Sequence, residues 1–506
     1  MSLFLIPEIQ RMKKALTILA LLGIILQNST AQTKQPSVQT KQIQRLNGSS
    51  ISTSDIDKII STLMNVADVT GLSISIINDN KIAYTKSYGY KNKEKNELND
   101  TSTVFYGASL SKAVFAYIVM QLVQEGTIDL DKGVWAYIDK PLPMYDSYNN
   151  LADDERWKQI TVRDCLRHTT GFPNWRWANP KGNNALEIFF DPGQRYAYSG
   201  EGMALLQLAV EEATHKSLEQ LAIERVFKPF GMTRTSYVWQ QSFENNYAFG
   251  YTPTGEVQKK KKRTVPNAAG SMETTIADYS RFIEAVMQGK GLKDTIKKEM
   301  LSPQIAIKTK HQFPSLNTDT LDDAYKSINL SYGLGWGLFK CAAGNAFFKE
   351  GHDDGWAHYN VNFPDKKISI ILMSNSLNAE SIFKEALEKI IGDVYTPWDW
   401  ENYEPYKVKE AVVKEIPKTV DTSLNQYAGV YAADSVKAMI TLEDGQLKVE
   451  LDKGGLQKTN LYMEKPDLFS LKAAAIQFQF SRNANGKIEK MIIIGGNEKH
   501  EFKKQD

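Results

Sequence analysis

Ser109 and Lys112 are spaced so that a hydroxyl and an amine share one side of a helix. The apolar positions that follow, from 113 to 123, recur at helical spacing and predict a buried helix that begins at the serine. Residues three apart on a helix lie one turn apart on the same face. A serine becomes a strong nucleophile only when a base takes its proton, and burial near a helix N-terminus lowers the pKa of a lysine. The pair therefore predicts nucleophilic chemistry at Ser109, whose backbone amide is also free at the helix end to receive an oxyanion.

Two distant segments supply groups that could complete a site around this serine. Tyr198 follows a turn and precedes a helix, and Lys349 lies on a predicted strand. A phenol beside two ammonium groups ionises below its ordinary pKa, so Tyr198 is predicted to shuttle protons while Lys349 keeps its charge. Ser381 and Lys384 repeat the serine and lysine spacing, and there we expect only an exposed helix face.

Taken together, these segments resemble the class C branch of the serine β-lactamase superfamily, which also holds DD-peptidases, D-aminopeptidases and esterases. The likeness extends over residues 56–391. The stretches that carry it are Ser109-Leu110-Ser111-Lys112 (the family's Ser-x-x-Lys), Tyr198-Ser199-Gly200 (its Tyr-x-Asn), Lys349-Glu350-Gly351 (its Lys-Thr-Gly), Arg167-His168-Thr169-Thr170-Gly171 (its His-Thr-Ser-Gly), Pro229-Phe230-Gly231-Met232 (its Pro-Leu-Gly-Met) and Ala269-Gly270-Ser271-Met272 (its glycine turn before a helix).

The resemblance implies an acyl-enzyme mechanism with a role for each matching residue. Ser109 would be the nucleophile, Lys112 its activating partner and Tyr198 the acid and base. Lys349 would give electrostatic support, and the amides of Ser109 and His352 would form the oxyanion hole. We expect no metal and no cofactor.

Gly200, Glu350 and Gly351 are the expected substrate-binding positions, and two of them depart from the family's pattern. Gly200 replaces an asparagine whose amide binds the acylamino group of penicillins and peptides. Glu350 replaces a hydroxyl residue that helps to hold a substrate carboxylate, and a negative charge there should repel one. Asp353 and Asp354 add acid nearby. We therefore expect β-lactams and peptides ending in a free carboxylate to be poor substrates, and esters or peptides with a free amino group to be better ones.

Other interpretations of these residues remain open at this point. A non-catalytic sensor or scaffold that keeps the fold is the alternative function, because Gly200 and Glu350 depart from the pattern. His168 could be a catalytic base, although we expect a hydrogen-bonded structural histidine. Trp175 and Trp177 could line the mouth of a pocket or pack a long loop.

A metal site at His352, Asp353, Asp354 and His358 is the other alternative for the residues near Lys349. A strand would point the two histidines to the same face but too far apart, without a clear third ligand. We therefore expect no metal there.

The N-terminal residues predict export to the periplasm or the extracellular space. Lys13 and Lys14 give a positive start, 15–26 is largely apolar, and 29–31 is a small-residue cleavage pattern, as in a secretory signal peptide. The apolar stretch is shorter than the roughly 20 residues that span a bilayer, so an uncleaved anchor is disfavoured. We expect no stable membrane insertion after cleavage.

The composition excludes several classes of protein. With 42% hydrophobic and 24% charged residues the 506-residue chain is neither disordered nor membrane-spanning, and a net charge of +2 gives no general attraction to nucleic acid. The basic run 259–263 is expected to be a solvated loop tip rather than a phosphate or headgroup site. Cys165 and Cys341 are expected to be structural free thiols rather than a disulfide. The partner that remains is a small-molecule or peptide substrate, and the sequence does not define the oligomeric state.

The order of predicted elements indicates an α+β fold. Strands at 71–77 and 82–88 precede the Ser109 helix, helices dominate 161–300, and strands return between 332 and 374. A sheet assembled from both ends of a domain, with helices inserted between, is an α+β arrangement. We predict an antiparallel sheet with flanking helices and an inserted all-helical subdomain.

The length and the change of pattern beyond 394 predict more than one domain. The expected organisation is a signal peptide at 1–31, a flexible leader at 32–51, a serine hydrolase domain at 52–394, a linker at 395–420 and a small all-β domain at 421–506. Short, regularly spaced strands favour a barrel or a sandwich for the last of these.

Overall fold

The structure is a computed structural model of the whole chain. It describes residues 41–316, 322–402, 404–406, 424–433, 436–443, 445–452, 456, 458–471, 476–495 and 498–505. The expected signal peptide at 1–31 lies outside the described residues. Within the part of the chain that is described, no helix combines the length and the apolar character needed to cross a bilayer.

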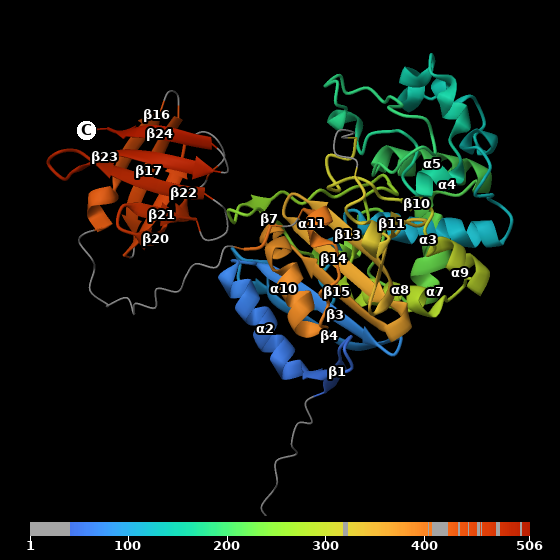
Figure 1. Ribbon diagram of the computed structural model, residues 1–506, viewed down its shortest axis with the longest axis horizontal. Coiled ribbons are helices and arrows are strands. Elements are labelled where there is room, and N and C mark those ends of the chain that lie inside the picture. Colours follow the sequence, from blue (N-terminus) through green and yellow to red (C-terminus); the bar gives the residue numbers. More distant parts are fainter. Residues whose placement is uncertain are drawn as a thin grey trace, which may run out of the picture. The chain divides into compact units, whose positions relative to one another are not determined.

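A nine-stranded antiparallel sheet forms the centre of the larger part of the molecule (Figure 1), in the order β10-β11-β12-β13-β14-β15-β3-β4-β5. Its strands are β3 (Gly71–Asn78), β4 (Lys81–Asn92), β5 (Glu97–Leu98), β10 (Ile305–Ala306), β11 (Ser331–Tyr332), β12 (Gly337–Cys341), β13 (Gly344–Asp353), β14 (Trp356–Phe363) and β15 (Ile368–Ser374). The late strand β15 pairs with the early strand β3, with Ile370 opposite Ile76. The sheet is thus built from both ends of residues 52–394, and the predicted α+β fold is confirmed.

Helices cover both faces of this sheet. They are α2 (Thr53–Val66) and α10 (Glu380–Ile390) on one face, and α3 (Leu110–Gln124) and α8 (Ile276–Gln288) on the other. Because successive side chains of a strand point to opposite faces, Ile370 packs in the core with α2 and α10 while Ile371 packs in the core with α3 and α8. Continuous apolar strands are therefore buried on both sides, and the second core holds the helix that carries Lys112.

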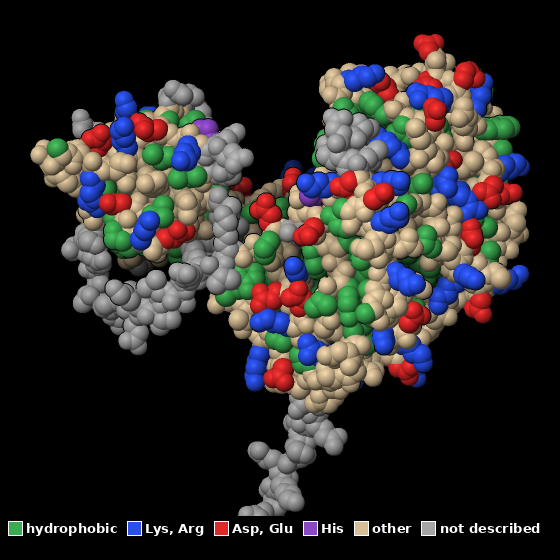
Figure 2. Space-filling model, in the orientation of Figure 1, with side chains coloured by type: hydrophobic (Ala, Val, Ile, Leu, Met, Phe, Trp, Pro, Cys, Tyr) green, Lys and Arg blue, Asp and Glu red, His purple; other side chains and the backbone are tan. Residues whose placement is uncertain are grey.

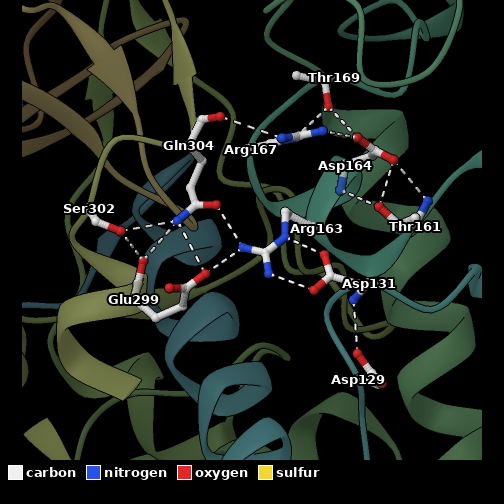
Figure 3. Close-up of polar contacts among 10 residues, drawn as sticks. All are labelled: Asp129, Asp131, Thr161, Arg163, Asp164, Arg167, Thr169, Glu299, Ser302 and Gln304. Carbon is white, nitrogen blue, oxygen red and sulfur yellow. Dashed lines mark hydrogen bonds and ion pairs between the residues drawn. The ribbon is translucent and has the colours of Figure 1, made fainter. Parts of the chain in front are cut away.

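The segment between the early and late strands is mainly helical, as predicted. It contains α4 (Val162–Leu166), α5 (Gly200–Thr214), α6 (Leu218–Ala222), α7 (Lys228–Phe230) and α9 (Asp294–Met300), besides α3, α8 and several 3-10 turns. Two short strand pairs interrupt it: β6 (Phe105–Tyr106) with β9 (Glu273–Thr274), and β7 (Gly250–Tyr251) with β8 (Val257–Gln258). Arg163 of α4 forms ion pairs with Asp131 and with Glu299 of α9, joining inserted segments that are far apart in sequence (Figure 3).

Two expected boundaries need correction. Part of the expected flexible leader is ordered, because β1 (Gln42–Gln44) pairs with β2 (Ser50–Ser52) and Ile43 is fully buried. The first part of the expected linker also belongs to the packed structure, since α11 (Trp398–Glu401) buries the ring of Trp400. An isolated apolar residue in a polar leader, and tryptophans between prolines, gave no periodic pattern. Their burial depends on partners that are distant in the sequence.

The basic run 259–263 is only in part the solvated loop tip that was expected: Lys259, Lys261 and Lys262 are exposed, whereas Lys260 and Arg263 pack against other segments. The Lys260 side chain is only 4% exposed and its Nζ lies 2.6 Å from Oε2 of Glu273. Arg263 stacks on the ring of Tyr106, with its guanidinium carbon 3.8 Å from the ring centroid. These partners come from β6 and β9, so local sequence could not indicate them. Over the described residues on the face seen in Figure 2, basic and acidic side chains are interspersed rather than gathered by sign.

The C-terminal strands form a second nine-stranded antiparallel sheet with its own core, in the order β19-β18-β17-β16-β24-β23-β22-β21-β20. They are β16 (Gly429–Ala433), β17 (Val436–Glu443), β18 (Gln446–Leu451), β19 (Thr459–Asn460), β20 (Tyr462–Lys465), β21 (Leu468–Ser470), β22 (Ile476–Arg482), β23 (Ile488–Gly495) and β24 (Glu498–Lys504). The first and last strands of this order are separated in sequence by Leu461 alone. The two edges must therefore meet, and the sheet curls into a barrel-like form.

Candidate active site

The helix α3 places Ser109 and Lys112 as the sequence predicts. Ser109 lies directly before the helix and is partly exposed, whereas Lys112 is buried. Lys112 Nζ lies 3.0 Å from Ser109 Oγ and donates a second hydrogen bond, of 2.6 Å, to the carbonyl oxygen of Ala269. The hydroxyl is thus open to a substrate while its partner amine is fixed from behind.

The charge state of Lys112 suits a base. Burial lowers the pKa of its amine well below the ordinary value, and the nearby positive charge of Lys349 lowers the pKa further. A neutral amine at 3.0 Å can accept the proton of the Ser109 hydroxyl. By contrast, Lys384 lies on the exposed side of α10, as expected for the second pair of that spacing.

The turn before α3 brings two backbone segments together. Ala108 has a φ of 45°, in the left-handed region that residues other than glycine rarely adopt. This conformation turns the chain sharply into the helix. The backbone amide of Ser109 makes no hydrogen bond to any other described residue. On β13, a Cβ at Gly351 would lie only 2.8 Å from the carbonyl oxygen of Gly107, so the two segments approach closely. His352, whose amide is the second expected oxyanion donor, follows Gly351 directly.

Tyr198 reaches this cluster from the N-terminus of α5. Ser199 caps that helix, because its hydroxyl accepts the amide hydrogen of Gly202. The cap fixes the position of Tyr198, the residue directly before it. Lys349 Nζ donates to the Tyr198 hydroxyl at 3.0 Å, and Lys112 Nζ lies 5.0 Å from the centre of its ring. The structure therefore brings all four expected catalytic side chains together.

The protonation expected for Tyr198 is wrong. Burial raises the pKa of its phenol above the ordinary value, although the charge of Lys349 and hydrogen bonds with Lys349 and Ser109 act in the opposite direction. The phenol is therefore the protonated partner and can give a proton to a leaving group. Neighbouring charges are visible in a motif, but the depth of burial that outweighs them is not.

His168 has the structural role that was expected. Its Nδ1 accepts the amide hydrogen of Ser199 at 3.2 Å, and its ring lies 4.4 Å from that of Tyr198. Burial lowers the pKa of His168 well below the ordinary value, with Lys112 and Lys349 acting in the same direction. A neutral histidine thus positions the tyrosine from behind.

Buried polar contacts hold the turn that carries His168 (Figure 3). The carboxylate of Asp164 accepts hydrogen bonds from the Arg167 guanidinium at 2.8 Å and from the Thr169 hydroxyl at 2.6 Å. The Thr169 carbonyl accepts the amide hydrogen of Gly193, in the turn that leads to Tyr198. This network connects α4 to the start of α5.

Glu350 was expected to face an incoming substrate. In the structure it is instead buried beside Lys349. Its Oε1 lies 2.8 Å from Lys349 Nζ and accepts a hydrogen bond of 2.8 Å from the side-chain amide of Gln312. Burial alone would raise the pKa of Glu350, but Lys349 holds that pKa below the ordinary value. Burial would lower the pKa of Lys349, yet the Glu350 carboxylate raises it well above the ordinary value. The pair is charged and its two charges cancel locally.

Gln312 is a site residue that the sequence did not reveal. It is buried, and its backbone amide donates to the carbonyl of Trp400 in α11. Glu401, next in α11, is also buried, and burial together with the charge of Glu350 raises its pKa well above the ordinary value. No motif marks these residues, because their position depends on a segment about 90 residues away along the chain.

An aromatic ring packs against Gly200. A Cβ at this position would lie 2.8 Å from the carbonyl oxygen of Asn174 and 2.9 Å from the ring of Trp175. The half-buried Trp175 ring lies 5.6 Å from Lys112 Nζ, so it borders the site, whereas Trp177 is 73% exposed. The space that an asparagine amide would take is occupied by tryptophan.

The histidines near Lys349 have separate partners. His352 is half-exposed and pairs with Glu380, with 2.6 Å between Nδ1 and Oε1. Burial would lower the pKa of His352, but the hydrogen bond and charge of Glu380 raise it. His358 is buried, lies 2.7 Å from the carbonyl oxygen of Tyr106, and has a pKa lowered by burial to about 4. Cys165 and Cys341 are free thiols, as expected.

The site and the fold define a class: a mixed α and β fold with a partly exposed serine beside two buried lysines and a buried tyrosine. The profile of the family described as Beta-lactamase matches residues 56–391. The chain belongs to the Beta-lactamase family, within the superfamily of serine β-lactamases and penicillin-binding proteins.

Curated relatives and solved structures agree with this assignment. The chain is 23% identical to Penicillin-binding protein 4* of Bacillus subtilis (strain 168), over 82% of this chain and 91% of that protein. It is 25% identical to Protein flp of Staphylococcus aureus (strain N315), over 65% of this chain and 64% of that protein.

The solved structures show the same fold at low identity. The octameric penicillin-binding protein homologue from Pyrococcus abyssi has a TM-score of 0.56 and 19% identity, covering 90% of this chain and 100% of its own. The D-alanine carboxypeptidase AmpC from Burkholderia cenocepacia has a TM-score of 0.53 and 19% identity, covering 67% of this chain and 99% of its own.

Proposed function

We propose that this protein is a serine hydrolase that forms an acyl-enzyme at Ser109 with an ester, amide or peptide substrate. The observation that carries the proposal is the 3.0 Å contact between the Ser109 hydroxyl and a buried lysine, with Tyr198 and Lys349 beside it. A Beta-lactamase family profile over the same region supports it.

The first half of the reaction follows from the protonation states. Neutral Lys112 takes the proton of the Ser109 hydroxyl as the oxygen attacks the substrate carbonyl. The oxyanion that forms is received by the amides of Ser109 and His352. Protonated Tyr198, held by Lys349, gives a proton to the leaving group as its bond to the carbonyl carbon breaks. Water then attacks the ester on Ser109 by the reverse sequence and releases the acid.

The substrate class follows from the buried pair of Lys349 and Glu350. In this pair the glutamate cancels the positive charge that would otherwise attract a substrate carboxylate. Trp175 fills the position where an asparagine would bind an acylamino group. We therefore propose an activity closer to that of an esterase or D-aminopeptidase than to that of an efficient β-lactamase.

A substrate screen tests both parts of this proposal. Purified protein is assayed with p-nitrophenyl esters, D-amino-acid amides and a chromogenic cephalosporin, with Ser109→Ala as the control. We expect ester or amide turnover that Ser109→Ala abolishes, and slow cephalosporin turnover. Cephalosporin hydrolysis faster than ester hydrolysis would contradict the substrate class. A folded protein that turns over nothing, and that no fluorophosphonate labels, would instead be the sensor or scaffold.

We also propose that the protein is exported and acts in the periplasm or outside the cell. The support is the basic and apolar start of the sequence with its small-residue pattern at 29–31. Expression in a bacterial host with sequencing of the mature N-terminus tests it. Processing after Ala31 is expected, and an intact N-terminus on cytosolic protein would contradict export.

A further inference from the structure

A cavity of about 490 Å³ shares a wall with the candidate active site. Trp175 lines this cavity, and the same ring lies 5.6 Å from Lys112 Nζ. Two further lining residues continue from site segments: Glu201 comes three residues after Tyr198, and Asn267 comes two residues before Ala269. Trp175 is thus shared by the cavity and the surroundings of Lys112, so the cavity adjoins the candidate active site.

The charged groups that line the cavity are mostly acidic. They are the carboxylates of Asp146, Glu201 and Glu211 against the single guanidinium of Arg176. Glu201 and Arg176 form an ion pair of 2.7 Å, which cancels one charge of each sign. Glu211 accepts hydrogen bonds from the Leu218 amide and the Gln207 side chain, neither of which carries a charge. Asp146 is exposed and has no ion pair with another described residue. Asp146 and Glu211 are thus the uncompensated carboxylates among the lining residues, and Lys140 Nζ lies 4.5 Å from the centre of the ring of the lining residue Tyr145.

A tyrosine hydroxyl reaches the cavity from the same wall. Tyr148 is 5% exposed and lines the cavity, and its hydroxyl makes no hydrogen bond to any residue in the described part of the chain. The buried side-chain atoms of the described residues that lack a partner do not include this hydroxyl, so it is open to the cavity. With Tyr145 and Trp175, it gives the cavity three aromatic rings beside its carboxylates. Aromatic faces next to carboxylates are the surroundings in which ammonium groups bind.

We propose that this cavity binds a positively charged ammonium group at the far end of the acyl group that Ser109 receives. The proposal rests on the proposed function, because it names the acyl group that the same serine accepts. A negatively charged or carboxylate-bearing acyl group is disfavoured by the same carboxylates. The charged ammonium group of the substrate thus lies on the acyl side of the scissile bond. It lies away from the ion pair of Lys349 and Glu350.

Two esters that differ only in charge test this assignment. One is p-nitrophenyl 4-(trimethylammonio)butanoate, and the other is its neutral isostere, p-nitrophenyl 5,5-dimethylhexanoate. Each kcat/KM is divided by the rate of uncatalysed hydrolysis, which removes the intrinsic effect of the charge. We expect a preference of about tenfold for the cationic ester, of the order that an aromatic and acidic site provides.

The variant Asp146→Asn/Glu211→Gln removes the two uncompensated charges and keeps the oxygen that accepts from the Leu218 amide. We expect it to reduce the preference to about twofold or less. Asp153→Asn removes an exposed acid of the same region that does not line the cavity, and it should leave the preference unchanged.

The outcomes separate this proposal from the proposed function. If a fluorophosphonate labels Ser109 and both esters react equally, the cavity has no role in charge recognition while the hydrolase assignment stands. If the preference survives in the double variant, the charge is recognised elsewhere and the assignment of this cavity is wrong. If neither labelling nor turnover occurs, both proposals fall together.

Discussion

Lys112 must be neutral to act as the base, and its surroundings favour the neutral amine. Burial and the charge of Lys349 lower the pKa of its amine. The amine is neutral above its pKa and charged below it, so activity should fall as the pH drops through that lowered pKa. An ordinary lysine would instead lose activity already below about pH 10.

The pH dependence of kcat/KM for a neutral ester measures this directly, because the substrate does not titrate. We expect the acid limb to lie well below the pKa of a free lysine. A rate that still rises steeply above about pH 10 would contradict the lowered pKa of Lys112, because an ordinary lysine gives that profile.

Glu350 sets the charge that a substrate meets beside Lys349. Glu350→Thr restores the residue found in the family's Lys-Thr-Gly pattern and leaves the charge of Lys349 uncancelled. We expect kcat/KM for a chromogenic cephalosporin to rise by about tenfold relative to a neutral ester, since an opposite charge now faces the substrate carboxylate. An unchanged ratio between the two substrates would mean that Glu350 does not control carboxylate recognition.

Spacing predicted the pair of Ser109 and Lys112, and the resemblance to the serine β-lactamase superfamily implied that Tyr198 and Lys349 join them, but neither predicted the states of these residues. Ser109 and Lys112 are on one helix, and Tyr198 and Lys349 each lie beside a marked turn or strand. The protonation of Tyr198, the buried position of Glu350 and the presence of Gln312 depend on packing by segments far away in sequence. Those features appear only when burial is known.

At the scale of elements, hydrogen bonds in the turn between α4 and α5 hold Tyr198 in position. Asp164 is buried and accepts from both Arg167 and Thr169. Asp164→Ala leaves these donors without their acceptor, and we expect a loss of about 3 kcal/mol in the free energy of unfolding together with a lower kcat.

Denaturant unfolding and ester kinetics measure the two effects. Asp153→Ala, at an exposed position outside the network, should change the free energy of unfolding by less than about 0.5 kcal/mol. An Asp164→Ala protein with unchanged stability and unchanged kcat would show that this network does not position Tyr198.

Elements with a strong periodic pattern were predictable, and elements held by tertiary contacts were not. The strand β3 shows an alternation of apolar residues with Ser73 and Ser75, β15 shows a largely apolar run because both of its faces are buried, and α3 is apolar because it is enclosed. The strands β1 and β2 contain three residues each, so there is no room for a pattern. The burial of Lys260 against Glu273 also has no local signal.

On the scale of the whole molecule, the cores on either side of the main sheet are made without residues of the C-terminal barrel-like sheet. The chain should therefore keep its chemistry when that sheet is removed. A protein that ends at Glu410 is expected to react with a fluorophosphonate within about twofold of the full-length rate, because each part has its own core.

Labelling rates of the two chains, compared with their thermal unfolding, check this expectation. A truncated chain that folds but does not label would place a catalytic contribution in residues 411–506. The barrel itself was predictable only as far as its strands, because its closure depends on the pairing order that brings β19 and β20 to opposite edges.

The central claim is that the hydroxyl of Ser109 attacks a carbonyl because the buried amine of Lys112 takes its proton. The most direct test is intact-mass and peptide analysis of the protein after brief reaction with a p-nitrophenyl ester, with Lys112→Ala and Lys384→Ala as the matched pair. The account predicts one acyl group, on Ser109, in the unchanged protein and in Lys384→Ala, and acylation about 10²- to 10⁴-fold slower in Lys112→Ala. An acyl group on another residue, or equal acylation of Lys112→Ala, would contradict it.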